Sequence, residues 1–374
     1  MDQPLGRRRF LGLLGAAGTG AIAACSGGGA SRTTTTSGRA DGGYVPPPGA
    51  WATVDPTAVG WDAAKLRAAL DFAGERSSRA MVVVHEGKVI AQQSWGATME
   101  FARDIASAQK GVVALLVGNL QAAGRMQIDE PVSSYLGPGW SRATPEQEAP
   151  ITVRHLLTMT SGLANDLTFQ AAPGAVWRYN TNAYQQLPVV VEAVAGTGID
   201  AVTRVELFDP IGVSSASGWR DRRTDGPVGV DPNGRRIKGL VMTAPDMARV
   251  GLVVQRDGIW GGRAVLDDPA YLAATLASSQ ELNPSYGYLW WLNGKAAHVL
   301  PGQPGGSSGP LVPDAPADLV AALGRDDQKI YVCPSLDLVV TRIGERGSAQ
   351  RADALSDFDN ELWRRLMTAA PPNA

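Results

Sequence analysis

Strand-type segments occur near both ends of this chain, and a long stretch without them separates the two groups. Residues 80–96 hold two β-rich runs around Glu86-Gly87-Lys88, a pattern typical of a hairpin. Helical spacing of apolar residues marks 59–76 and 352–367. The later strand-type runs are 286–294, 317–324, 329–333 and 336–344. We therefore expect an α+β fold, in which both ends of the chain build one antiparallel sheet flanked by N- and C-terminal helices.

The middle of the chain, residues 104–284, has mostly helix and loop patterns, so we expect an inserted helical subdomain there. Residues 51–103 and 285–370 would form the α/β part that contains the sheet. The folded domain would thus extend over 51–370, and its 44% hydrophobic composition is enough for a large core.

The first residues resemble an export signal. Arg7-Arg8-Arg9 precedes Phe10-Leu11 and a weakly apolar run that is too short and glycine-rich to span a membrane. This pattern resembles a twin-arginine signal over residues 1–24. Ile22-Ala23-Ala24-Cys25 is similar to a bacterial lipobox, in which Cys25 is lipidated and becomes the mature N-terminus. A plain cleavable signal is the alternative.

Residues 25–50 are rich in Gly, Ser, Thr and Pro, so they are expected to form a disordered tether. The protein would then be an exported lipoprotein on the outer face of the cytoplasmic membrane or in the periplasm. Only two cysteines occur, so lipidation of Cys25 leaves none to pair with Cys333. Cys333 lies in an apolar run and is expected to be a buried, inert thiol.

Ser107 and Lys110 stand three residues apart at the start of an apolar segment, 104–120. Positions three apart share one face of a helix. A serine needs a nearby base to become a nucleophile, and burial lowers the pKa of a lysine so that its amine can accept a proton. Of the six lysines, only Lys110 has a serine three residues before it. The spacing therefore indicates a Ser-x-x-Lys nucleophile, although the motif also arises by chance.

Six segments in order make this chain similar to the serine β-lactamase and penicillin-binding-protein-like superfamily. The similarity is greatest to its class C, esterase and 6-aminohexanoate-dimer-hydrolase branch. In addition to the Ser-x-x-Lys helix, the matching segments are "MQIDEPVSSYLGPGW", "ITVRHLLTMTSGL", "PGAVWRYNTNAY", "GLVMTAPDMARVGLVVQRDGIW", "YGYLWW" and "LVAALGRDDQKIYVCPSLDLVVTRIG". The resemblance implies a β-lactamase/transpeptidase-like fold and a serine hydrolase activity that uses no cofactor.

Carried over by motif, the resemblance assigns roles to individual residues. Ser107 would be the acyl-forming nucleophile and Lys110 its activator. Tyr179 would transfer a proton to the leaving group as part of one unit with Lys110. The oxyanion hole would consist of the backbone N–H groups of Ser107 and of Arg325, which follows Gly324 on the third-motif strand.

Two departures from the family pattern bear on the substrate. Thr181 stands at the third position of the Tyr-x-Asn element, and Asn182 follows it. Ala322 stands where β-lactamases and DD-peptidases carry the Lys or His that meets a substrate carboxylate. We therefore expect hydrolysis of esters or linear amides. The alternatives are a weak β-lactamase, a DD-peptidase or D-aminopeptidase acting on cell-wall material, or a non-catalytic protein that binds cell-wall fragments.

Other residues are expected to have lesser roles. His155 would be structural, Trp177 and Trp290 would either line the pocket or belong to the core, and Gln328 would fix a strand turn. A formal net charge of −2 gives no reason to expect nucleic acid as a partner. No cluster of Cys, His, Asp or Glu has metal-ligand spacing. The expected partners are a small ester or amide substrate and, through the lipid, a membrane; the oligomeric state is left open.

Overall fold

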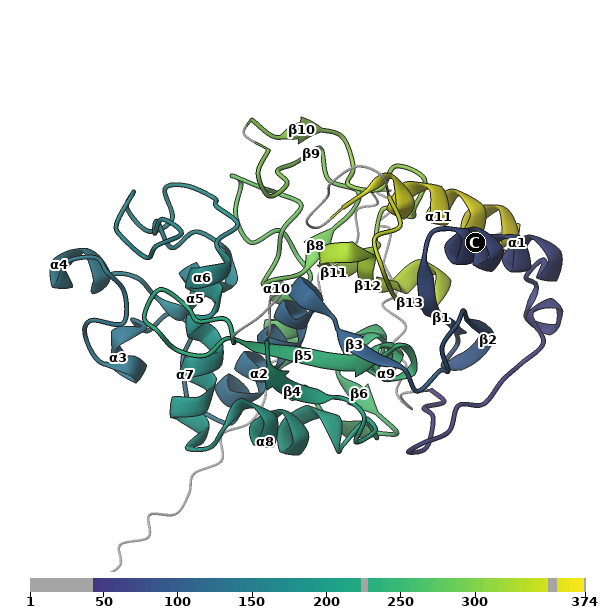
Figure 1. Ribbon diagram of the computed structural model, residues 1–374, viewed down its shortest axis with the longest axis horizontal. Helices are drawn as coiled ribbons and strands as arrows, with labels where there is room; N and C mark the ends of the chain where they lie inside the picture. Colours follow the sequence, from purple (N-terminus) through teal and green to yellow (C-terminus); the bar gives the residue numbers. More distant parts are fainter. Residues whose placement is uncertain (1–42, 223–227, 304, 349–354, 373–374) are drawn as a thin grey trace, which may run out of the picture. The chain divides into compact units, whose positions relative to one another are not determined.

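The largest element of the computed structural model is a six-stranded antiparallel sheet with the strand order β2-β1-β13-β12-β11-β8 (Figure 1). The structure describes residues 43–222, 228–303, 305–348 and 355–372. The strands of this sheet are β1 (Ser78–His85), β2 (Lys88–Ser94), β8 (Trp291–Leu292), β11 (Val320–Gly324), β12 (Gln328–Cys333) and β13 (Leu338–Gly344). The prediction that both ends of the chain build the sheet is confirmed, since β1 lies between β2 and β13.

Both faces of the central strands are covered, which explains why β12 and β13 are buried along their whole length. Ile330 and Val332 point toward Gly251 on helix α9 (Ala244–Gln255). Lys329 and Tyr331, the alternate residues, contact the C-terminal helix α11 (Asp357–Ala369). Successive side chains of a strand point to opposite faces, so α9 and α11 lie on opposite sides of the sheet.

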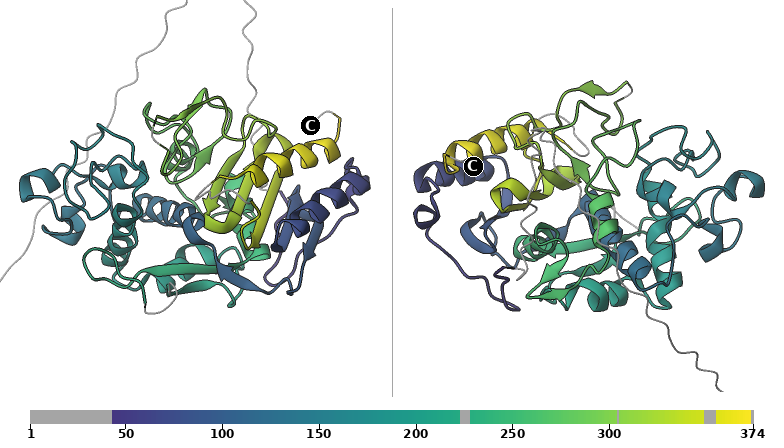
Figure 2. Two further views of the ribbon diagram at one scale, coloured as in Figure 1. Left: turned by 45° about the horizontal axis from the view of Figure 1, so that its top comes forward. Right: turned by 180° about the vertical axis from the view of Figure 1, so that it is seen from behind.

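Helix α1 (Ala63–Glu75) packs beside α11, and both views in Figure 2 show the two helices side by side. Asp62 N–H donates to the carbonyl of Ala369, and the rings of Phe72 and Phe358 stack 5.7 Å apart. The expectation of flanking terminal helices is therefore confirmed. The two helices join the two ends of the chain on one face of the sheet.

A buried charged cluster fastens α11 to the sheet. The Lys329 ammonium, fully buried, lies 2.8 Å from a carboxylate oxygen of Asp359 and 3.2 Å from one of Asp327. The Tyr331 hydroxyl donates to the same Asp359 at 2.6 Å. Each buried charge has an opposite charge and hydrogen bonds beside it, which offsets the cost of its removal from water.

A second antiparallel sheet of order β3-β5-β4 joins two strands of the inserted part, expected to be helical over residues 104–284, to a strand that ends where this part begins. These strands are β3 (Ala102–Asp104), β4 (Gly218–Asp221) and β5 (Lys238–Thr243). The helices here are α2 (Gln109–Ala122), α3 (Ser133–Leu136), α4 (Pro145–Glu148), α5 (Val153–Leu157), α6 (Thr181–Tyr184), α7 (Gln186–Ala195), α8 (Ile199–Thr203), α9 and α10 (Pro269–Thr275). The short pairs β6–β7 (Ile259–Trp260, Arg263–Ala264) and β9–β10 (Ala297–His298, Ser307–Ser308) complete the strands. The inserted part is therefore mostly helix and loop, as expected, and it also contains strands such as β4 and β5 that the sequence did not indicate.

The described part of the expected tether is packed against the fold. Buried Arg249 of α9 donates hydrogen bonds to the carbonyls of Pro46, Pro47 and Ala50. The unit that contains both sheets includes the described residues 43–50, which precede the expected boundary at residue 51. The expected disorder is therefore wrong for residues 46–50, because the buried guanidinium of Arg249 binds carbonyl groups of this segment.

The expected signal over residues 1–24 and the expected lipidation site Cys25 lie outside the described residues. Among the described residues, no helix is long and apolar enough to cross a membrane. Cys333 is buried, as expected, and its burial raises the pKa of the thiol to about 12.

Candidate active site

Ser107 and Lys110 meet at the start of helix α2. Ser107 lies in the 3₁₀ turn η2 (Ala106–Ala108) that leads into the helix, and Lys110 is the second residue of α2. The Lys110 Nζ donates to the Ser107 Oγ at 2.9 Å, and Lys110 is only 2% exposed. The Ser-x-x-Lys spacing thus places a buried amine in direct contact with the hydroxyl.

Two aromatic rings and a hydroxyl surround the amine. The Lys110 Nζ lies 4.9 Å from the ring centre of Tyr179 and 4.6 Å from that of Tyr184. It also contacts the Thr181 Oγ1 at 3.5 Å. Burial, together with the positive charge of Arg222, lowers the pKa of Lys110 from its usual value of 10.5 to about 7. The lowered pKa makes the neutral amine, which can accept a proton, far more accessible near neutral pH than in an exposed lysine.

Tyr179 comes to this amine from the segment that precedes α6. Its ring is partly buried and packs nearly parallel to that of Trp291, with 6.0 Å between the ring centres. The structure therefore brings together the three residues expected to be catalytic, Ser107, Lys110 and Tyr179, although the sequence separates Tyr179 from the others by about 70 residues.

Thr181, not Asn182, faces the lysine. Asn182 Nδ2 donates to the carbonyl of Asn165 at 2.6 Å. Asn180, one residue earlier, caps α6 by accepting from the Ala183 N–H at 3.0 Å. The departure from the Tyr-x-Asn pattern thus leaves a threonine hydroxyl where the family pattern has an amide.

The end of β11 closely approaches the turn that carries Ser107. A methyl group on Gly324 would lie 2.2 Å from the Ile105 carbonyl oxygen and 3.1 Å from the Ala108 backbone nitrogen, so only glycine fits. Arg325, the next residue, lines the same cleft as Ser107. This contact brings together the two segments expected to supply the oxyanion hole.

The sequence did not reveal a salt bridge, between Arg222 and Asp104, that supports the turn before Ser107. Arg222 donates to both carboxylate oxygens of Asp104, at 2.7 and 2.8 Å, and to the Gln109 Oε1 at 2.9 Å. Asp104 in turn accepts from the Ala106 N–H at 2.8 Å. Ala106 has a φ of +50°, an unfavourable conformation for a residue with a side chain. The Arg222–Asp104 pair therefore supports a strained turn directly before Ser107.

The cleft above Ser107 has a volume of about 630 Å³. Its lining includes the candidate residues Ser107, Tyr179, Thr181 and Arg325, together with Asn165 and Asn182. Arg103, Asp104, Arg222 and Asp326 also line it, so charged groups predominate on this side.

The structure also locates the residues expected to have lesser roles. The His155 Nδ1 accepts from the Thr152 N–H and so caps α5, in agreement with a structural role. Gln328 donates to the carbonyls of Asp326 and Gly344, which holds the turn between β11 and β12. Trp290 is fully buried, whereas Trp177 is partly exposed and lines a neighbouring groove.

Ala322 does not reach the cleft. It is buried on β11, and its Cβ lies 3.1 Å from where a methyl group on Gly111 of α2 would be, beside Trp290. A lysine at position 322 would have to displace these neighbours, so its substitution by lysine would not simply restore the family's cation.

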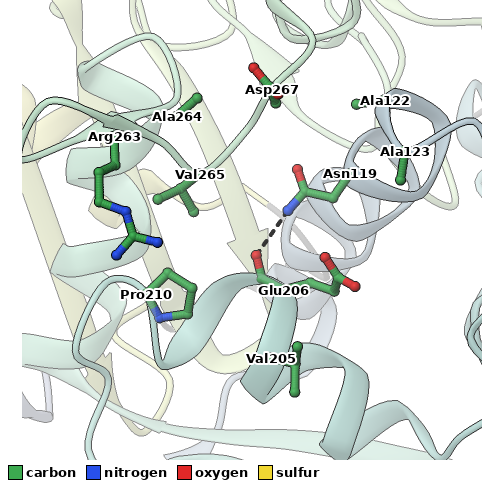
Figure 3. Close-up of a pocket in the computed structure, with 10 residues that line it drawn as sticks. All are labelled: Asn119, Ala122, Ala123, Val205, Glu206, Pro210, Arg263, Ala264, Val265 and Asp267. Atoms are coloured by element: carbon green, nitrogen blue, oxygen red, sulfur yellow. Dashed lines mark hydrogen bonds between the residues drawn. The ribbon is translucent and has the colours of Figure 1, made fainter.

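A separate cavity of about 300 Å³ lies toward the other end of α2 (Figure 3). Asn119 there donates to the carbonyl of Glu206, and Val205, Arg263 and Asp267 also line the cavity. None of the expected site residues belongs to it. Within the part of the chain that the structure describes, no group of His, Cys, Asp and Glu side chains could hold a metal ion.

An antiparallel sheet with both terminal helices on one face, an inserted part and a Ser-x-x-Lys turn at the start of a buried helix together define the fold of the serine β-lactamases and penicillin-binding proteins. The family model named Beta-lactamase matches residues 63–343, about three quarters of the chain, and the protein belongs to this family.

Known proteins with similar sequences or folds agree with this assignment. Esterase EstB of Burkholderia gladioli is 28% identical over a segment that covers 43% of this chain and 54% of the esterase. Penicillin-binding protein 4 of Amycolatopsis lactamdurans is also 28% identical, over 37% of this chain and 41% of that protein. The chain thus spans about half or less of these relatives. A penicillin-binding-protein homologue from Caulobacter crescentus has a TM-score of 0.60 at 16% identity, covering 86% of this chain and 99% of the homologue.

Proposed function

We propose that this protein is a serine hydrolase that cleaves ester or linear amide bonds through an acyl-enzyme on Ser107. The observation that carries the proposal is the 2.9 Å contact between the Ser107 hydroxyl and a buried lysine whose pKa is lowered to about 7. The similarity to an esterase over part of the chain supports the same class of reaction.

The first half of the reaction forms the acyl-enzyme. The neutral Lys110 amine takes the proton of the Ser107 hydroxyl as the oxygen attacks the substrate carbonyl. The negative charge that develops on the carbonyl oxygen faces the backbone N–H groups of Ser107 and Arg325. The bond to the alcohol or amine then breaks, and the leaving group receives the proton through Tyr179. Ser107 now carries the acyl group, and Lys110 is neutral again.

The second half uses water in the place of the alcohol. Lys110 and Tyr179, acting as one unit, accept one proton from the water as the water oxygen attacks the acyl carbon. The bond to the Ser107 oxygen breaks, and this oxygen takes back the same proton from Lys110 and Tyr179, which leaves the amine neutral again. The products are a carboxylic acid and the free enzyme, so no cofactor or metal is required by the balance of atoms.

The lack of a cation at position 322 favours neutral substrates. A penicillin or a terminal D-alanine carries a carboxylate beside the bond that is cleaved, and the family pattern meets it with a cation on this strand. Here the position is a buried alanine packed toward Gly111. The loss of a charge-assisted hydrogen bond costs about 1.5–3 kcal/mol, so binding of such substrates should weaken roughly tenfold to a hundredfold.

A weak β-lactamase or cell-wall peptidase activity is the second candidate. The Arg325 side chain is largely exposed and belongs to a residue that lines the cleft, so a substrate carboxylate could meet a different cation there. A non-catalytic binding protein is disfavoured because such a protein gains nothing from a buried lysine in contact with a serine hydroxyl.

Covalent labelling with a fluorophosphonate tests the proposal. We expect labelling of the wild-type protein, no labelling of Ser107→Ala, and normal labelling of Ser134→Ala, an exposed serine on α3. The wild-type protein should turn over p-nitrophenyl butyrate with a higher kcat/KM than nitrocefin. Turnover by Ser107→Ala above a few per cent of wild type would refute the nucleophile, and faster nitrocefin hydrolysis would favour the second candidate.

A further inference from the structure

A second groove continues the cleft above Ser107 on the side of Tyr179. It has a volume of about 710 Å³ and shares four residues with the cleft. The shared residues are Asn165, Tyr179, Pro301 and Gly302. A ligand could therefore extend from Ser107 past Tyr179 into the groove without leaving the protein surface.

The groove differs from the cleft in its chemistry. Val176, Trp177, Leu282, Val299 and Leu300 give it a mainly apolar lining. Val176 is 38% exposed and Leu282 is 44% exposed, which makes them two of the few large apolar side chains left open to solvent in the described residues. Apolar side chains that face one groove beside a candidate active site indicate a site for an apolar ligand group.

The position of Tyr179 decides which end of a substrate enters the groove. Ser107 lines only the cleft, whereas Tyr179 lines both the cleft and the groove. In the proposed reaction, the acyl group remains bonded to Ser107, and the leaving group takes its proton from Tyr179. The leaving group must therefore lie on the Tyr179 side of the scissile bond, where the groove begins.

We infer that the groove binds an apolar leaving group and that the substrates are esters or amides of elongated apolar alcohols or amines. The acyl part would be short or polar, because Arg103, Arg222 and Arg325 line the cleft that receives it. This inference rests on the proposed function, since it uses the acyl-enzyme on Ser107 to orient the substrate.

Two isomeric esters test the orientation directly. Hexyl acetate and ethyl hexanoate have the same atoms, but the longer chain is the alcohol in the first and the acyl group in the second. The ratio kcat/KM reports on events up to the release of the alcohol, so it senses the leaving group. Each methylene group that the groove removes from water strengthens binding about fourfold. We expect hexyl acetate to have at least a tenfold higher kcat/KM.

Leu282→Asp should reduce the preference for hexyl acetate over ethyl hexanoate by at least fivefold, because a carboxylate then faces the apolar chain. Val205→Asp is the matched control, since Val205 is 68% exposed and lies outside both the cleft and the groove. It should leave the preference unchanged.

Equal kcat/KM values for the isomers, or a preference for ethyl hexanoate, would overturn the inference while leaving the serine hydrolase in place. An unchanged preference in Leu282→Asp would also overturn it. Failure to hydrolyse either ester, together with no covalent labelling of Ser107, would refute the proposed function and this inference with it.

Discussion

Lys110 is suited to accept a proton because its surroundings disfavour its charge. It is buried between two tyrosine rings, and Arg222 adds a second positive charge nearby. Both effects lower the pKa of the amine, and burial is the larger. An exposed lysine at the same spacing would remain protonated at neutral pH and could not take the proton of Ser107.

The pH dependence of the reaction follows from this lowered pKa. Below pH 7 the amine of Lys110 is mostly protonated and cannot act as a base, whereas above pH 7 it is mostly neutral. We expect kcat/KM for p-nitrophenyl butyrate to rise with pH, to reach half of its maximum near pH 7, and to level off above pH 8. A half-maximum above pH 9 would show that the amine keeps its usual pKa.

Arg222→Gln should move this half-maximum to higher pH, because it removes a positive charge near Lys110 and leaves the negative charge of Asp104 in place. The activity at pH 7 should fall, and part of it should return at pH 9. Arg220→Gln, which removes an exposed arginine two residues away, should leave the profile unchanged. An equal loss at every pH in Arg222→Gln would mean that Arg222 acts only by supporting the turn.

The sequence predicted one half of this site better than the other. Ser107 and Lys110 are three residues apart, so helix geometry alone brings them together. Arg222 and Asp104 are 118 residues apart, and their contact depends on the pairing of β3, β5 and β4. These strands are only three to six residues long, and such short segments within a helical stretch carry too little periodicity to be recognised.

At the scale of elements, the close approach of β11 to the turn η2 leaves no room for a side chain at Gly324. Gly324→Ala should lower kcat by about 10²-fold or more, because the added methyl group pushes the backbone of Arg325 away from Ser107, and the loss of one oxyanion donor has an effect of this size. The measurement is single-turnover acylation with p-nitrophenyl butyrate. Gly198→Ala, where a methyl group meets no close neighbour, is the control. Wild-type acylation in Gly324→Ala would exclude this role for the strand end.

Helix α9 has a second function besides covering the sheet, since its Arg249 holds residues 46–50. Arg249→Gln removes the donors for the carbonyls of Pro46, Pro47, Ala50 and Ile211. We expect the free energy of unfolding to fall by about 2–4 kcal/mol, the range for a broken buried hydrogen-bond network. Urea denaturation measures this change, with exposed Arg263→Gln as the control. A change below about 0.5 kcal/mol would contradict the role of Arg249.

The tether was predicted to reach residue 50 because composition shows only that a segment cannot form its own core. Composition cannot show whether such a segment packs against another element of the fold. The polar stretch before Trp51 is held through its backbone carbonyls, which every residue has, so no side-chain pattern could have marked where the packed chain begins.

At the scale of the whole molecule, a lipid on Cys25, as the sequence predicts, would determine where the protein works. Cys25→Ser should release the protein from the membrane fraction or block its processing, because the lipid would have no site of attachment. Replacement of Arg8 and Arg9 by lysine should stop export through the twin-arginine route. Fractionation of cells followed by immunoblotting checks both outcomes. Unchanged partitioning of Cys25→Ser after washing of the membranes would disprove the lipid anchor.

The overall fold was the most predictable level, because strand patterns at both ends with a long insertion between them allow few arrangements of one sheet. What the sequence could not show was the groove beside Tyr179. Its walls come from the segment before α6 and from loops near β9, and the conformation of such loops depends on contacts that no local pattern encodes.

The pairing of β1 with β13 also affects how the chain must be made. Ser78 pairs with Gly344, so a ribosome that has completed the first hairpin still has most of the protein to synthesise. At about 5–20 residues per second, the nascent hairpin waits on the order of 10–50 s for its partner strand. During this time its apolar edge is open to chaperones or to other chains. A premature stop codon before residue 338 therefore leaves a polypeptide that no later event can complete.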